Sequence, residues 1–175
     1  MKGAMGVSHL EDLIVEYYDW QGYLVKRNIK VGPLDHGGWE GELDVVAYHP
    51  LKNHLVHLEP SVDAHTWAVR ERRFEKKFES GRKYIFSTVF PWLDTNTTLE
   101  QVAVIPSHPK GRNALAGGIL RSIDELAAEI REQVTSRGII ARGAIPEQYP
   151  LLRTIQLTHC GYYGNVLNPI PLIQP

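Results

Sequence analysis

Two short apolar runs separated by a polar turn dominate the first third of the chain. The runs cover residues 41–48 and 54–59 and are rich in Val, Leu and Tyr, which predicts two antiparallel strands joined by a tight connection. Glu42 and Asp44 are two residues apart, so their carboxylates would leave the same face of the first strand. Glu59 closes the second strand.

These three acids indicate a bound cation. Carboxylates without a partner beside an apolar core are costly to remove from water, because burial penalises their charged form. A divalent metal ion held by Glu42, Asp44 and Glu59 would offset that cost. The sequence therefore predicts a metal site on one face of the hairpin.

The same residues resemble a known motif. Gly-Glu-x-Asp, followed by a hairpin and then by hydrophobic-x-Glu-x-x, is similar to the core of the PD-(D/E)xK phosphodiesterase superfamily, which includes restriction endonucleases and Holliday-junction resolvases. The resemblance implies that Asp44 and Glu59 bind Mg²⁺ or Mn²⁺ and that Glu42 is an extra acid found in some members. It also implies that Pro60 lends a backbone carbonyl to the metal.

The lysine of that motif is replaced. Its position is Ser61, which could at most donate a hydrogen bond, whereas superfamily members use the lysine to assist the attacking water. Some members present a lysine from the following helix instead, and here residues 63–80 predict that helix. Lys77, on the border of its apolar stripe, is the candidate for a relocated lysine, and Arg70 on the same border could neutralise a phosphate. The alternative is that both form ordinary surface ion pairs.

Periodicity and breaker residues outline an α/β fold around the hairpin. The predicted elements are a helix at 8–20, a strand at 23–31, the hairpin, a helix at 63–80 capped by Asp63 and ended by Gly81, strands at 83–90 and 99–105, a helix at 122–136 and an edge strand at 152–159. This order, α-β-β-β-α-β plus C-terminal additions, is the one that the resemblance implies: a restriction-endonuclease-like mixed central sheet flanked by helices.

The chain has the length of one domain, since 175 residues bury a substantial core. We expect residues 1–175 to form a single domain with a nuclease-like core at about 8–105. A C-terminal helix and edge strand would cover about 106–160, and a proline-rich extended tail 161–175.

Three residues outside the motif could contact nucleic acid. Trp39, in a glycine-rich loop, could stack on a base, and Lys110 and Arg112 could contact a nucleic-acid backbone. Surface loops carry such residues routinely, so packing and solvation are the alternative interpretation.

Three further residues are accessory candidates. Among the acids of the first helix, Glu16 is a stronger candidate than Glu11 or Asp12 for leaning toward the metal, as in resolvase-like relatives. His57 shares the strand face of Glu59 and could tune the site, and His65 could contact a phosphate. For the acids, the competing interpretation is a solvated helix face. For His57, it is a core histidine whose hydrogen bonds are satisfied within the protein.

Net charge and cysteine content constrain the partners and the cellular compartment that we expect for the protein. The net charge is -1, so any nucleic-acid contact must come from a local basic patch. The single cysteine, Cys160, fits a reducing cytoplasm, and no apolar run has the length of a membrane span. No spacing typical of zinc sites, serine hydrolases, P-loop enzymes or dinucleotide-binding proteins occurs.

The sequence thus predicts a cytoplasmic, Mg²⁺- or Mn²⁺-dependent nuclease that hydrolyses phosphodiesters of DNA rather than RNA. The alternative is a catalytically inactive member of the same fold that serves as a nucleic-acid-binding or assembly module, and a defence nuclease specific for RNA is a third hypothesis. Because many members of the superfamily pair, a homodimer is also expected.

Overall fold

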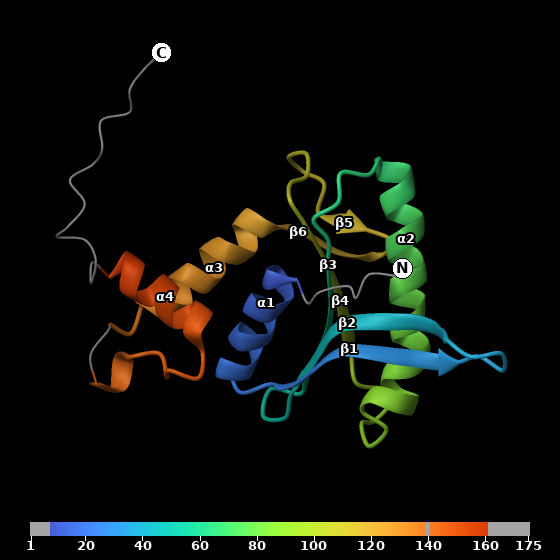
Figure 1. Ribbon diagram of the computed structural model, residues 1–175, viewed down its shortest axis with the longest axis horizontal. Helices are drawn as coiled ribbons and strands as arrows, with labels where there is room; N and C mark the ends of the chain where they lie inside the picture. Colours follow the sequence, from blue (N-terminus) through green and yellow to red (C-terminus); the bar gives the residue numbers. More distant parts are fainter. Residues whose placement is uncertain (1–7, 139–140, 161–175) are drawn as a thin grey trace, which may run out of the picture. The chain divides into compact units, whose positions relative to one another are not determined.

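The computed structural model describes residues 8–138 and 141–160, and the chain divides into two compact units, residues 1–126 and 127–175 (Figure 1). The helices and strands are α1 (His9–Trp20), β1 (Leu24–Pro33), β2 (Trp39–His49), β3 (His54–Pro60), α2 (Trp67–Tyr84), β4 (Leu99–Ile105), β5 (Ala114–Leu115), β6 (Gly118–Ser122), α3 (Ile123–Thr135) and α4 (Pro150–His159). A π-helical turn, Ile85–Val89, continues α2, and a 3₁₀ turn covers Ala141–Gly143.

The strands form one mixed sheet in the order β1-β2-β3-β4-β6-β5. β1, β2 and β3 pair antiparallel through short turns, whereas β3, β4 and β6 pair parallel. The parallel step from β3 to β4 needs a long crossover, which α2 supplies. The predicted α/β class with a mixed sheet flanked by helices is therefore confirmed.

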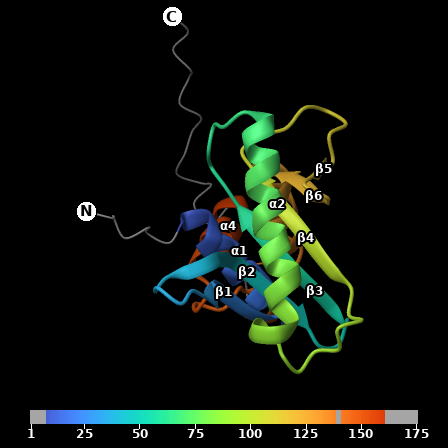
Figure 2. The same ribbon diagram turned by 90° about the vertical axis from the view of Figure 1, so that its right-hand side faces the viewer.

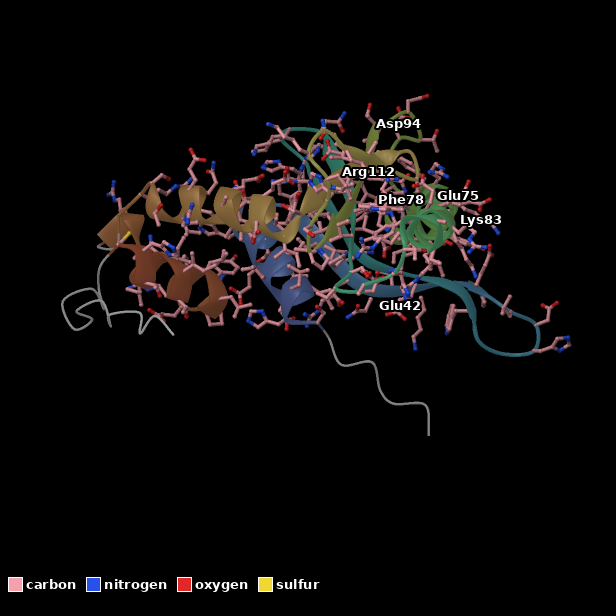
Figure 3. All side chains as sticks on the ribbon, turned by 90° about the horizontal axis from the view of Figure 1, so that it is seen from above. Glu42, Glu75, Phe78, Lys83, Asp94 and Arg112 are labelled. Atoms are coloured by element: carbon pink, nitrogen blue, oxygen red, sulfur yellow. The ribbon has the colours of Figure 1, made fainter. Side chains whose placement is uncertain are left out.

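Helices α1 and α2 lie on opposite sides of this sheet (Figures 1 and 2). The apolar stripe predicted for α2 is confirmed, because Phe74 and Phe78 are buried against β4, β5 and β6. Figure 3 looks along α2 and shows Phe78 on the side of the sheet, with Glu75 and Lys83 on the other side. α2 thus covers the sheet face from which Glu59 and its neighbours project.

Two boundaries predicted for α2 are wrong. The helix begins after Thr66 rather than at Asp63, whose carboxylate instead binds the side chains of Arg70 and Arg73. It also continues through Gly81, which lies in the helix interior and is buried. A glycine that looks like a stop is here a position where neighbouring side chains leave no room for a Cβ.

Two predicted strands are helical. Residues 83–89 complete α2 and its π-helical turn, and Phe90 follows as a non-helical cap; Ile85 and Val89, four residues apart, are both buried. A short apolar run fits a buried strand or a buried helix equally well. Residues 152–159 form α4, in which Leu152 and Gln156 are buried at helical spacing. β6, which the sequence analysis did not predict, takes the place beside β4.

A capping box begins α3. Ser122 accepts a hydrogen bond from the backbone N–H of Glu125, and Glu125 accepts one from the backbone N–H of Ser122. Within residues 8–138 and 141–160, no helix is both long enough and apolar enough to cross a membrane. The predicted tail lies outside the described residues.

Candidate functional site

The antiparallel register of β2 and β3 places Asp44 beside Glu59. Val45 pairs with Leu58 and Val46 with His57, so the next pair along is Asp44 and Glu59. The backbone N–H of Asp44 donates to Glu59 Oε1 over 3.2 Å. The Glu59 side chain is fully buried and that of Asp44 is 16% exposed. Two acids therefore meet at the edge of the core, as the alternation of the hairpin predicts.

Lys77 joins these two acids from α2. Its Nζ donates to Asp44 Oδ2 over 2.7 Å and also donates to Glu59 Oε2. Lys77 immediately precedes the buried Phe78, so its aliphatic stem follows the edge of the apolar stripe while its ammonium group turns toward the acids. The structure thus brings together Asp44, Glu59 and the lysine that the sequence analysis selected from the helix.

Two oppositely shifted carboxyl groups result from this arrangement. Burial first, and then the negative charge of Glu59, raises the pKa of Asp44 to about 8. Burial opposes ionisation of Glu59 too, but the hydrogen bond and electrostatic interaction with His57, together with the charge of Lys77, lower the pKa of Glu59. His57 and Lys77 thus favour the charged form of Glu59, whereas burial and the neighbouring charge of Glu59 favour the neutral form of Asp44.

Pockets open on two sides of the Lys77 contact. One has a volume of about 160 Å³ and the other about 210 Å³, and Asp44 and Lys77 line both. The remaining lining residues of the smaller pocket are Glu11, Pro60, Ser61, Asp63, Arg73 and Phe74, and those of the larger are Glu40, Gly41, Glu42, Lys76 and Ser80. Several water molecules, or a phosphate group, fit such volumes.

Glu42 does not join the two other acids. Among the described residues, no three His, Cys, Asp or Glu side chains come together closely enough to hold a metal ion. Glu42 lies two residues before Asp44 on β2, a step of about 6.6 Å along a strand, and its register position is beyond the end of β3. The predicted convergence of three acids is therefore wrong, although Glu42 still lines the larger pocket.

The first helix contributes Glu11 rather than Glu16 to the lining. Glu11 lies in the first turn of α1 and faces the smaller pocket with Asp44 and Lys77. Burial raises the pKa of Glu11. Glu16, which the sequence analysis placed first, is not among the residues that line either pocket.

Ser61 and Arg70 are both engaged with Asp63. Ser61 Oγ donates to Asp63 Oδ2 over 2.6 Å, and Arg70 donates to Asp63 through both Nε and Nη2. Arg73 donates to Asp63 Oδ2 over 2.9 Å, and the backbone N–H of His65, whose side chain is exposed, donates to Oδ1. Burial favours the neutral form of Asp63, but these donors outweigh that effect and lower the pKa of Asp63 to about 2.

Trp39, Lys110 and Arg112 are the other residues that the sequence predicts to contact nucleic acid. Trp39, at the start of β2, is 49% exposed, and Lys110 is exposed in the loop after β4. Arg112 stacks on Trp67 with 3.9 Å between its guanidinium carbon and the ring centre. None of these three residues lines either pocket.

Sequence reasoning missed Arg73 and Gln101. Arg73 is 49% exposed at the smaller pocket, and only its place on the helix, one turn before Lys77, could have indicated it. Gln101, on β4, contacts His57 across a parallel strand pair, and no local pattern announces such a contact.

Comparisons with family models, curated proteins and solved structures found no significant match.

Proposed function

We propose that this chain is a metal-dependent nuclease that hydrolyses phosphodiester bonds, in the manner of the PD-(D/E)xK superfamily, with DNA as substrate. The observation that carries the proposal is the contact of Lys77 Nζ with both Asp44 and Glu59. An acid pair on a hairpin and a lysine meet at one point, although the motif position of the lysine is Ser61. A restriction-endonuclease-like core, acting in the cytoplasm, is part of this proposal.

The donor atoms suit Mg²⁺ or Mn²⁺. Asp44 Oδ2 and Glu59 Oε2 are hard carboxylate oxygens from adjacent strands, and both already share one cation, the ammonium group of Lys77. Pro60 lines the same pocket, and its carbonyl oxygen would complete the ligand set together with water. When bound, such an ion supplies an acidic water and offsets negative charge on the phosphate.

The protein groups divide the remaining work. Asp44 and Glu59 would hold the ion, and Lys77, once released from them, would place its positive charge against the scissile phosphate. Arg73, half exposed at the rim of the smaller pocket, would bind the phosphate of a neighbouring nucleotide. Glu11 is close enough to the pocket to accept a proton from water.

Cleavage of end-labelled DNA in Mn²⁺ or Mg²⁺ tests the proposal. We expect the wild type to cut, and the variants Asp44→Asn and Lys77→Met to lose cutting. Lys52→Met, a matched lysine substitution in the exposed turn after β2, should cut like the wild type. No cutting of DNA by the wild type in either ion, or full activity of Asp44→Asn, would overturn the proposal. Cutting of RNA alone would overturn the assignment of DNA.

A catalytically inactive module is the second candidate. The observation in its favour is that the hydroxyl of Ser61 is bound to Asp63, while the site is occupied by the ion pairs of Lys77. That candidate predicts DNA binding without cleavage, and equal binding by the wild type and Asp44→Asn. The homodimer stays a prediction.

A further inference from the structure

A chain of hydrogen bonds leads from Arg82, near the C-terminal end of α2, to the buried Glu59. Arg82 Nη1 donates to Gln101 Oε1 over 2.8 Å, and Gln101 Nε2 lies 3.1 Å from His57 Nδ1. His57 Nε2 lies 2.7 Å from Glu59 Oε1. The side chains of His57 and Glu59 are both fully buried. The contacts therefore form one path in the order Arg82, Gln101, His57, Glu59.

The partners fix the direction of each hydrogen bond. Gln101 Oε1 accepts from Arg82, so the amide nitrogen of Gln101 is the atom that donates to the carbonyl of Phe78 over 2.8 Å. The same nitrogen faces His57 Nδ1, which must accept. His57 then carries its proton on Nε2 and donates it to Glu59 Oε1.

Gly81 makes room for this path. Glycine inside a helix is less favourable than alanine by about 1 kcal/mol, yet Gly81 is buried within α2. A Cβ there would lie 2.7 Å from His57 Cε1 and 2.9 Å from Gln101 Nε2, closer than packed atoms approach. α2 can therefore cover the ring of His57 only because position 81 has no side chain.

The two oxygens of Glu59 have different tasks as a result. Oε1 accepts from His57 Nε2 and from the backbone N–H of Asp44, while Oε2 faces Lys77. With two donors on Oε1, the carboxylate cannot turn to present both oxygens to one ion. Only Oε2 remains for a ligand.

We propose that His57 and Gln101 are positioning residues that make Glu59 a one-oxygen ligand, and so make the site prefer Mg²⁺ or Mn²⁺ over Ca²⁺. The proposal rests on the proposed function, because it concerns the same cation site. Ca²⁺ takes six to eight oxygens and often binds a carboxylate through both of its oxygens, whereas Mg²⁺ is octahedral and takes one oxygen from each carboxylate.

Calorimetric titrations with Mn²⁺ and with Ca²⁺ test this assignment. In His57→Leu the carboxylate of Glu59 is free to turn, so Mn²⁺ affinity should fall. A fall of about 10- to 100-fold is expected, as when a residue that hydrogen-bonds to a metal ligand is removed. Ca²⁺ affinity should fall less, and the ratio of the two affinities should therefore drop by about tenfold. His57→Gln, whose amide can still donate to Oε1, should keep a ratio close to that of the wild type.

A second variant covers the case in which His57→Leu does not fold. Gln101→Met keeps the volume of a half-buried side chain and removes the donor to His57 Nδ1, so it should lower the same ratio by less. A wild-type ratio in a folded His57→Leu or, where that variant fails to fold, in Gln101→Met would overturn the inference and leave the proposed function standing. A wild type that binds neither cation would overturn both.

Discussion

Removal of the Lys77 ammonium group should lower the stability of the fold. This group makes charge-assisted hydrogen bonds to Asp44 and Glu59, and each such bond contributes about 1.5–3 kcal/mol in mutational series. We take the low end of this range because the Lys77 side chain is 32% exposed and solvent screens part of the interaction. Asp44 can also lower the penalty by keeping its proton. The variant Lys77→Met should therefore lose about 2 kcal/mol of unfolding free energy.

Urea denaturation at neutral pH without divalent ions measures this loss. For a chain of this size, 2 kcal/mol corresponds to a fall in melting temperature of about 4–8 °C. The loss should be larger at about pH 9 than at about pH 6, because Asp44, with a pKa of about 8, carries its negative charge only at the higher pH. Lys52→Met, the surface control, should stay within about 0.5 kcal/mol of the wild type. An equally small effect of Lys77→Met would refute the reasoning.

Three further outcomes follow from the same contacts. Because the folded pKa of Asp44 is about 8, against an ordinary value of 3.8, stability should fall as pH rises from about 4 to about 8 and level off above that; urea titrations should show a flatter pH profile for Asp44→Asn. Asp63→Asn should cost about 1–2 kcal/mol at neutral pH, and this difference from the wild type should vanish as pH falls from about 4 to about 2, since the folded pKa of Asp63 is about 2. Gly81→Ala should lower the melting temperature, because overpacking against His57 costs about 1–3 kcal/mol, more than alanine gains in a helix; a calorimetric scan that shows a more stable variant would contradict the packing described.

The hairpin was predictable because its pattern is local. Alternation over residues 41–48 and 54–59 assigns each side chain to a sheet face, and the short turn sets the register. Together these place Asp44 beside Glu59, as the structure has them. The position of Lys77 could be predicted for a similar reason, since helical spacing from Phe74 and Phe78 puts it at the border of the buried stripe.

The errors arose where local patterns are ambiguous. Residues 152–159 alternate like a strand, yet the hydroxyls of Thr154 and Thr158 bond to carbonyls four residues back, which satisfies them inside a helix. Alternation also placed Glu42 on the correct face of the strand. It does not show that Glu42 lies too far along the strand to join Asp44 and Glu59. Gln101 and Gly81 reach His57 only once β4 and α2 are in place, so no window of sequence reveals them.

A titration of the wild type and of Glu59→Gln with Mn²⁺ tests the central claim, that Asp44 and Glu59 form a cation site. We expect the wild type to have one site that fills below millimolar Mn²⁺, and we expect Glu59→Gln to bind Mn²⁺ much more weakly. No heat of binding from the wild type at millimolar Mn²⁺, or equal binding by the two proteins, would contradict it.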